Sequence, residues 1–453
     1  MATLIRIANK SQTDTYDLIS GTYKLVDGTN VWPLQTASNG RKNIKEQLLL
    51  VGDADPSTVL IPSTTDLEKI LWKAEQWHSD PFLDESYWLE WNVDGESAKR
   101  ALIMPEWALS RVIKHGINPL MNQGELNVQR LIFNRHPLNE SVAASSASNT
   151  GLSSIGGNLT ITNDGTWPSR IASITFENNS SAGTYKKIWA GIRPIYEGVS
   201  SFEEVWESED GTIGTDTTVT ADTPASGGST MKCTFATATL AERYTIRASD
   251  VLLSGDALQK GKYLILLRYR SSVSSSATYG IQLKLGYDGG ANFEEKDEIF
   301  VTTADTNYHF VELGTVSFPP GDERNRVATD MLLAQFKFWA ERLDGTANLY
   351  FDCHIMMPAT HSLFLDDCDI DNTGEAVIHY TAEDDDQTQA ISFDSGPSIK
   401  RQAQASPNNW SIPIGETTGG HLVICAERDD SSIKADTVDV TVSYHNRWLS
   451  YRG

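Results

Sequence analysis

Apolar and polar residues alternate in many short stretches along the 453-residue chain. A period of two predicts strands that bury one face. One stretch differs, because its apolar residues from Leu67 to Trp77 are spaced as on one face of a helix and follow helix-capping residues at 63–66. The sequence therefore predicts a mainly β protein with one helix near its N-terminus. The strands expected before residue 142 are 3–7, 16–19, 23–25, 43–51, 88–93, 99–104 and 126–133, and 106–113 fits either a strand or a short helix.

The rest of the chain predicts an interrupted sandwich. Residues 141–157 are rich in Ser, Ala, Asn and Gly, which is typical of a flexible crossing between units. Beyond them, similar strand-like stretches lie on both sides of a central segment, and insertion at a hairpin tip leaves a host core intact. The strands expected in the two flanks are 170–177, 186–192, 376–380, 390–393, 410–414, 421–426 and 438–444. The predicted units are 1–141, a β-domain with one helix; 142–199 with 360–453, a discontinuous β-sandwich; and 200–359, an inserted β-sandwich.

Composition narrows the functional classes. At about 100–200 residues per domain, the length fits two to four domains. The formal net charge is -23 and the pI is near 4.7, so the protein surface is negatively charged at neutral pH and repels phosphate groups. We therefore expect neither specific nucleic-acid binding nor attachment to anionic membranes. The sequence shows no secretory signal and no apolar run of about 18 residues, so no membrane insertion is expected. Four isolated cysteines predict free thiols and assembly in a reducing cytosol.

Three carboxylates are candidates for a metal site. Glu207 and Glu209 are two residues apart, so on a strand both side chains point to the same face. Asp352 lies in a later apolar, strand-like run. Carboxylates on neighbouring strand ends suit Ca²⁺, which takes about six to eight oxygen ligands. The alternative is that all three are solvated strand residues.

Aromatic residues of the central segment have two interpretations. Tyr279, Tyr287 and Phe293 lie in or beside its loops, where aromatic faces either stack on sugar rings or anchor the loops by packing. Tryptophans at apolar positions of strands or the helix are expected in the core instead. These are Trp72, Trp77, Trp88, Trp91, Trp189 and Trp339.

The sequence has none of the common catalytic motifs. It lacks a phosphate-binding Gly-rich loop, a Gly-x-Ser-x-Gly elbow and a His-Glu-x-x-His pair. A glycosidase needs two carboxylates in one cleft, and nothing selects such a pair among 60 acidic residues. We therefore expect no enzymatic activity, and a polysaccharide-degrading enzyme remains an alternative.

Four short stretches of the central segment resemble, in sequence and order, those of a known family. They are Trp206-Glu207-Ser208-Glu209, Ala225-Ser226-Gly227-Gly228, Gly261-Lys262-Tyr263 in a strand that ends in Arg270, and the apolar-Asp run 349–355. In this order they resemble the carbohydrate-binding modules of families 6 and 35. The resemblance implies a jelly-roll β-sandwich in which the Glu pair and Asp352 hold a structural calcium ion.

The flanking parts carry a second resemblance, on residues 88–89, 99–104, 127–137, 158–168 and 440–449. These resemble a distal tail (baseplate hub) protein of long-tailed bacteriophages. That family implies a homohexameric ring continuing the tail tube, an outer galectin-like sandwich, and a place in the virion tail beside tail-tip proteins. Together with the inserted module, it implies attachment to host-surface polysaccharide. A free polysaccharide-binding adhesin, or another minor decoration protein of the virion, is the alternative.

Overall fold

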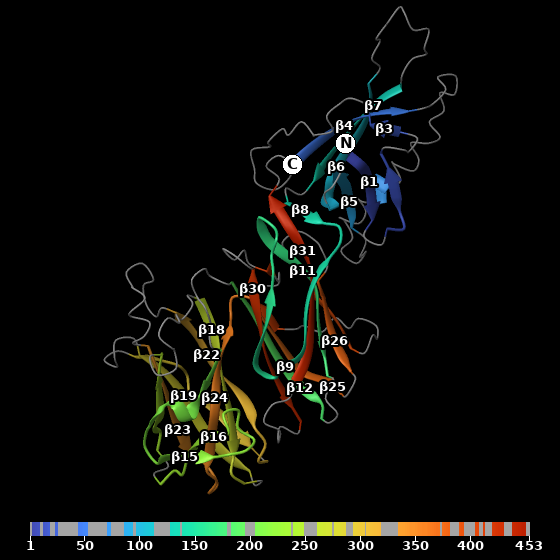
Figure 1. Ribbon diagram of the computed structural model, residues 1–453. Coiled ribbons are helices and arrows are strands. Elements are labelled where there is room, and N and C mark those ends of the chain that lie inside the picture. The colour runs from blue at the N-terminus through green and yellow to red at the C-terminus, as the bar shows by residue number, and fades with distance from the viewer. Residues whose placement is uncertain are drawn as a thin grey trace, which may run out of the picture.

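A computed structural model gives the fold, and strands dominate the residues that it describes (Figure 1). The prediction of a mainly β protein is confirmed. Of the expected helix, the structure describes one turn at 70–73. The described residues are 2–9, 12–18, 23–25, 44–52, 70–73, 86–93, 97–112, 127–135, 138–178, 183–194, 204–236, 239–248, 261–273, 276–286, 293–303, 305–318, 334–371, 374–380, 389–393, 404–406, 411–412, 419–429 and 437–449.

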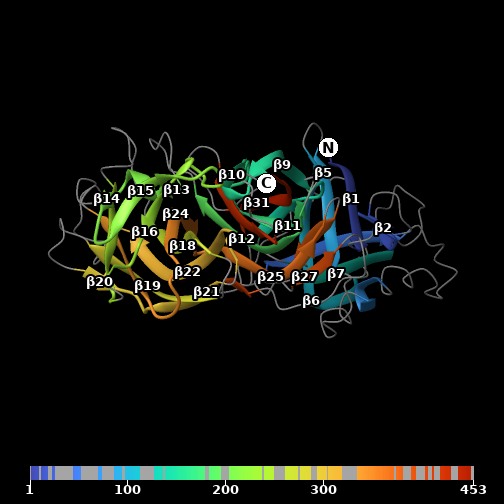
Figure 2. The same cartoon turned by 90° about the horizontal axis from the view of Figure 1, so that it is seen from below.

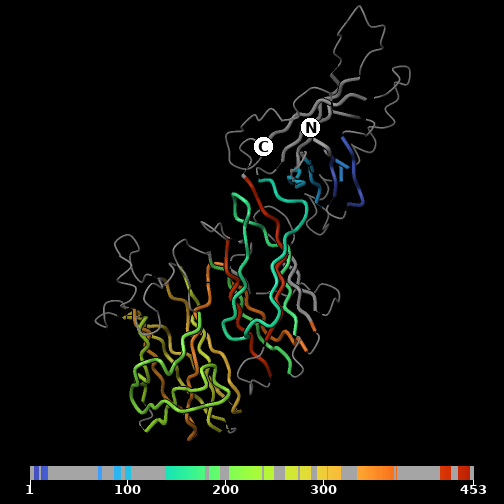
Figure 3. The backbone as a smooth tube through the Cα atoms, in the orientation of Figure 1, coloured from blue at the N-terminus to red at the C-terminus, as the bar shows by residue number. Residues whose placement is uncertain are grey.

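Three parts follow one another along the molecule (Figures 1 and 2). The N-terminal strands lie at one end, strands from 138–194 and 362–449 form a sandwich in the middle, and strands from 205–358 form another at the far end. We call the middle part the host sandwich and the far part the module. Figure 3 traces the chain from the module back into the host sandwich, where β24 (Leu349–Pro358) leads directly to β25 (Ser362–Ile370).

The N-terminal strands surround one long strand. Residues 106–112 continue the second strand of the predicted hairpin, because Lys99–Val112 is a single strand, β6, and Ile113 lies outside the described residues. It pairs with β5 near its start and with β7 from Ile103 onward, with a register shift between Met104 and Trp107. The other strands are β1 (Ala2–Asn9), β2 (Thr15–Asp17), β3 (Tyr23–Leu25), β4 (Ile44–Gly52), β5 (Tyr87–Val93) and β7 (Asn127–Arg135).

The segment 141–157 is not the flexible crossing that its composition predicts. It contains β9 (Ser145–Ser153) and the start of β10 (Ile155–Ile161). β9 pairs along its length with β31 (Thr437–Leu449). Because most side chains of β9 are exposed and polar, they show no apolar alternation, and backbone hydrogen bonds to β31 form the strand.

Two sheets form the host sandwich, and both take strands from before and after the module. The first is the part β8-β31-β11-β26-β27 of a 14-stranded sheet that begins among the N-terminal strands. The second, which we call host sheet 2, has the order β10-β30-β12-β25-β28. Side chains such as Phe176, Tyr185 and Ile424 fill the core between them. The remaining strands are β8 (Leu138–Ser141), β11 (Trp167–Glu177), β12 (Tyr185–Pro194), β26 (Glu375–Tyr380), β27 (Gln389–Phe393), β28 (Gln404–Ser406), β29 (Ser411–Ile412) and β30 (Gly420–Arg428).

A buried ionic cluster joins the N-terminal strands to the host sandwich. Glu140 on β8 accepts hydrogen bonds from Arg100 on β6 at 2.9 Å and from Arg170 on β11 at 2.8 and 2.9 Å. Burial alone would raise the pKa of Glu140, but the two arginines outweigh it and hold the pKa well below its ordinary value. The ionised carboxylate therefore links three strands at the junction.

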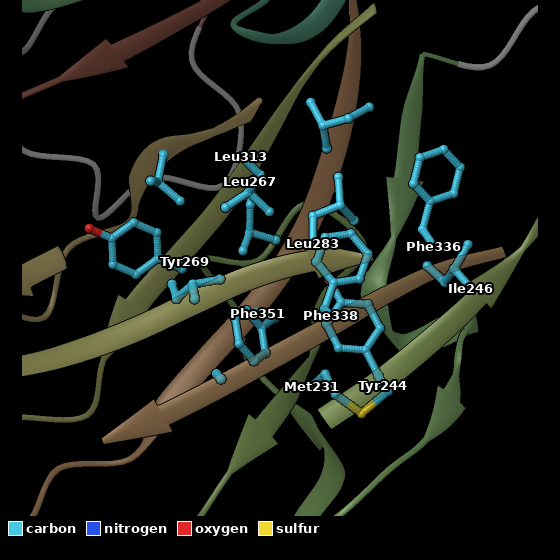
Figure 4. Close-up of a cluster of buried hydrophobic side chains, with 14 of the residues drawn as sticks. Met231, Tyr244, Ile246, Leu267, Tyr269, Leu283, Leu313, Phe336, Phe338 and Phe351 are labelled. Carbon is cyan, nitrogen blue, oxygen red and sulfur yellow. The ribbon is translucent and has the colours of Figure 1, made fainter. Parts of the chain in front are cut away.

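The module is a sandwich of two six-stranded sheets. Module sheet 1 has the order β15-β16-β24-β18-β22 with β13 beside β24, and module sheet 2 has β14-β17-β23-β19-β20 with β21 beside β19. In the core between them, the ring of Tyr244 stacks on Phe338 at a centroid distance of 4.4 Å and lies 5.4 Å from Phe351 (Figure 4). The strands are β13 (Val205–Glu207), β14 (Thr212–Ile213), β15 (Thr217–Ala221), β16 (Ser229–Cys233), β17 (Ala241–Arg247), β18 (Gly261–Ser271), β19 (Ala277–Gly286), β20 (Phe293–Glu295), β21 (Ile299–Thr303), β22 (His309–Phe318) and β23 (Gln335–Arg342).

An apolar interface fixes the module to the host sandwich. Trp189 and Cys425 of host sheet 2 are buried against Phe310 and Cys353 of module sheet 1. The indole Nε1–H of Trp189 also donates a hydrogen bond to Glu312 of the module at 2.7 Å. Module sheet 1 therefore packs on the host sandwich, and the outer side of module sheet 2 is the side turned away from it.

Candidate functional site

The outer side of module sheet 2 carries aromatic side chains among polar ones. On β23, Phe338 and Ala340 lie in the module core, so Trp339 between them points outward. On β21, Val301 lies in the core and Phe300 points outward by the same alternation. We call this outer side, around Trp339 and Phe300, the aromatic face.

Trp339 is partly exposed and lies among hydrogen-bonding side chains. Glu242 on β17 and Gln282 on β19 are its register partners, one on each side. The ammonium group of Lys284 lies 4.2 Å from the centroid of the indole ring. The indole Nε1–H is buried and has no hydrogen-bond partner among the described residues. This position therefore combines an aromatic ring with an unused donor.

Phe300 is 61% exposed, the highest value among large apolar side chains in the described part of the chain. Its register partner Gly280 has no side chain and pairs on its other side with Glu341. The carboxylate of Glu298 reaches over this glycine, since a Cβ at Gly280 would lie 2.0 Å from Glu298 Oε1. Burial raises the pKa of Glu298, and the charge of Glu341 adds to the rise. Two carboxylates thus lie beside an exposed ring.

One of the three aromatic residues expected to contact sugar lies on this face. Phe293 on β20 has the ammonium group of Lys337 4.6 Å from its ring centroid. For Tyr279 the packing interpretation holds and the sugar-stacking one is wrong, because the period of two places its ring on the inner side of β19, fully buried 5.7 Å from the Phe235 ring. Tyr287 lies outside the described residues.

The aromatic face depends on two residues that are not among the candidate sugar-binding residues of the sequence. Trp339 was expected in the core, and Phe300 had no role. The signal was the alternation in β23, where Trp339 shares its side with Lys337 and Glu341 and not with Phe338. Of the other tryptophans expected in the core, Trp88 and Trp189 are buried, Trp91 is partly exposed, Trp72 is 58% exposed and Trp77 lies outside the described residues.

The carboxylates predicted to bind calcium lie together at module sheet 1. Glu207 ends β13, Glu209 lies in the 3-10 turn η1 (Ser208–Asp210), and Asp352 is on β24. Carboxylate oxygens of Glu207 and Asp352 lie within 4.8 Å of each other. A Cβ at Gly227 would lie 2.3 Å from Glu209 Oε1 and 3.3 Å from Glu207 Cδ, so both carboxylates lie close against this glycine. We call Glu207, Glu209 and Asp352 the acidic cluster.

The acidic cluster has only part of its hydrogen-bonding capacity filled. The hydroxyl of Ser226 donates to Glu207 at 2.5 Å, and its backbone N–H donates to Asp352 at 2.9 Å. Asp352 also forms a buried ion pair with Arg268. Glu209 Oε2 is buried without a hydrogen-bond partner in the part of the chain that the structure describes. Three carboxylates therefore face one arginine.

The residues of the acidic cluster fit a calcium ion. Burial raises the pKa of Glu207 to about 7, and the charges of Asp352 and Glu209 add to the rise. Burial also raises the pKa of Glu209. A hard cation would relieve this repulsion, and carboxylate oxygens are the ligands it prefers. The Cys353 thiol is also nearby, but burial raises its pKa well above the ordinary value, and sulfur is a soft ligand that does not suit calcium.

Comparison with solved structures finds carbohydrate-binding modules. A xylan-binding domain of family 22 is similar at 17% identity and a TM-score of 0.20, covering 40% of this chain and 97% of that domain. A tandem of two family 22 modules from Paenibacillus barcinonensis Xyn10C gives 10% identity and a TM-score of 0.22, over 59% of this chain and 99% of the tandem. An exo-β-1,3-galactanase from Phanerochaete chrysosporium gives 13% identity and 0.21, over 61% and 66%. The carbohydrate-binding modules named here are of family 22.

No family model matches the chain, and no curated protein matches it in sequence. Structural similarity at TM-scores of 0.20 to 0.22 does not identify what this chain binds. Among the helical residues that the structure describes, none form a segment long and apolar enough to cross a membrane.

Proposed function

We propose that the chain is a non-enzymatic binding protein whose module holds a glycan on its aromatic face. The observation that carries the proposal is the placement of Trp339 and Phe300, which lie among carboxylate, amide and ammonium groups on the module side turned away from the host sandwich. Sugar rings offer apolar faces for aromatic stacking and hydroxyls for hydrogen bonds. A bound sugar would replace the Lys284 ammonium over Trp339 and stack on the partly exposed indole ring.

Affinity electrophoresis through gels that contain soluble polysaccharides tests the proposal. We expect at least one polysaccharide of a broad panel to retard the full chain. Phe300→Ser should abolish the retardation, whereas Ile213→Ser should keep it, because Ile213 is 53% exposed on β14, at the other edge of the same sheet. No retardation of the wild-type chain by any polysaccharide, or equal loss in both variants, would contradict the proposal.

We propose further that the chain assembles in the tail tip of a long-tailed bacteriophage, as a homohexameric ring against the tail tube that presents the module to the host surface. The resemblance of the flanking sequences to distal tail proteins supports this. The sheet of the N-terminal part ends in the short edge strand β2, and a closed ring would cover such edges. Negative-stain images of the purified chain with tail-tube protein should show six-fold rings, and particles that stay monomeric would contradict this part.

We also propose that the acidic cluster binds a structural calcium ion through Glu207, Glu209 and Asp352. When bound, the ion would neutralise the repelling carboxylates and stabilise the module by linkage. Added calcium should raise the melting temperature of the full chain over that with a chelator. Glu207→Gln should remove the response and Asp369→Asn should not, because Asp369 is a 59% exposed surface carboxylate. An unchanged wild-type melt with calcium and with chelator would overturn this assignment.

A further inference from the structure

His309, on β22 of the module, lies between two carboxylates at the edge of the apolar interface. Its Nε2 is 2.9 Å from Oδ1 of Asp305 in the module, and its Nδ1 is 3.3 Å from Oε1 of Glu427 on β30 of the host sandwich. The second oxygen of Glu427 accepts the backbone N–H of Phe310 at 2.8 Å. A polar connection therefore joins the two sandwiches beside their apolar contact.

Both contacts can be hydrogen bonds at the same time only when the imidazole is doubly protonated. Ionised carboxylates only accept hydrogen bonds, so each ring nitrogen of His309 must carry a hydrogen to bond both Asp305 and Glu427. A neutral ring has one N–H and would turn a lone pair toward the other carboxylate. Burial alone would lower the pKa of His309, but the hydrogen bonds and charges of Glu427 and Asp305 outweigh it and raise the pKa above its ordinary value.

Two further groups face this connection. The ammonium group of Lys187, on β12 of the host sandwich, lies 3.6 Å from Oε1 of Glu427 and stays beside it when His309 loses its proton. The ring of Tyr269 on β18 lies 6.2 Å from the His309 ring. Burial raises the pKa of Tyr269, so this phenol stays neutral across the range in which a histidine titrates. His309 is therefore the group whose charge changes there.

We propose that His309 is a pH-sensitive latch that holds the module against the host sandwich when protonated and loosens it when neutral. A base whose pKa is raised in the folded state contributes stability that is fully present below its unfolded pKa, about 6.5. That contribution is lost as the pH rises through the raised value. Docking is thus firmest in mildly acidic solution and weaker in alkaline solution. The proposal is independent of what the module binds.

The four cysteines provide a reporter of docking. Cys353 and Cys425 are fully buried in the interface between the sandwiches, so Cys425 becomes accessible when the module lifts away. Cys233 is buried in the module core and Cys368 in the core of the host sandwich, so both stay protected unless a sandwich unfolds. The natural chain therefore contains both the probe and its internal controls.

Pulsed thiol alkylation of the full chain, read by mass spectrometry of the Cys425 peptide, tests the latch. His309→Gln mimics the neutral ring, and taking its labelling rate relative to wild type at the same pH cancels the ionisation of the thiol. At about pH 6 we expect Cys425 to label about fivefold faster in the variant, which corresponds to about 1 kcal/mol. At about pH 8.5 the two rates should agree within about twofold.

Lys187→Gln is the matched control, because it removes the other cation beside Glu427 and keeps the His309 imidazole. Its labelling ratio to wild type should be the same at both pH values. A His309→Gln ratio that does not change between the two pH values would overturn the proposal. Labelling of Cys233 that rises together with Cys425 would also overturn it, because the module would then be unfolding and not undocking.

Discussion

At the scale of single residues, His354 is a buried polar side chain in apolar surroundings. It is fully buried on β24, and neither ring nitrogen has a hydrogen-bond partner among the described residues. The rings of Trp206, Phe336 and Phe338 surround it at centroid distances of 5.3, 5.2 and 4.9 Å. Burial lowers its pKa to about 3, so the side chain is a neutral polar group in an aromatic core.

His354→Phe should therefore stabilise the module by about 1–3 kcal/mol, because it removes buried polar atoms without partners and keeps the volume. Below about pH 6.5 the unfolded chain protonates His354 while the folded chain does not, so wild-type stability falls as the pH falls toward 3. In His354→Phe, the part of this pH dependence of the unfolding free energy that comes from protonating His354 should be absent. Urea unfolding across this pH range measures both effects, and a destabilised variant with an unchanged pH dependence would contradict this account.

At the scale of elements, the sequence predicts strands well where one face is buried. The hairpin of β5 and β6 and the strands on both flanks of the module follow from alternation. β9 could not be predicted in this way, because its partner β31 lies nearly 300 residues later and exposed polar side chains leave no period. Long-range backbone pairing has no local sequence signal.

The two candidate sites also differ in whether the sequence could predict them. Glu207, Glu209 and Asp352 could be brought together by residue type and order. The structure places a carboxylate oxygen of Glu207 within 4.8 Å of one of Asp352, and Glu207 and Glu209 both lie against Gly227. The aromatic face could not, because Trp339 and Phe300 come from β23 and β21, which do not pair with each other and are joined through β19. Which apolar residues of a strand face outward depends on register across three strands, and local sequence does not contain that information.

Gly191 on β12 lies at a close approach of the two sandwiches. A Cβ there would lie 2.4 Å from the backbone oxygen of Pro358, which cannot move aside as a flexible side chain does. Gly191→Ala should therefore loosen docking and lower the melting temperature, with a cost of about 1–3 kcal/mol. Gly261→Ala is the control, since its nearest contact would be the Tyr263 ring at 3.3 Å. Equal melting temperatures of the Gly191 variant and wild type would argue against a tight interface.

At the scale of the whole molecule, the module is more than a tethered insert. Its removal would uncover Trp189, Val423 and Cys425 of host sheet 2, all buried in the interface. We expect a chain in which a short Gly-Ser linker replaces 200–359 to fold but self-associate, and to bind an apolar fluorescent dye. Adding Trp189→Gln and Val423→Thr should reduce both effects. A monomeric, dye-negative deletion chain without these changes would show that the interface is not formed in solution.

The glycan-binding aromatic face is the central claim, and titration calorimetry of the full chain with the polysaccharide that retards it most tests that claim directly. Trp339→Ala should raise Kd at least about tenfold, equivalent to about 1.4 kcal/mol, because it removes the stacking ring. Trp167→Ala removes a 41% exposed tryptophan of the host sandwich and should leave Kd unchanged. An unchanged Kd in Trp339→Ala, or an equal loss in both variants, would contradict the account.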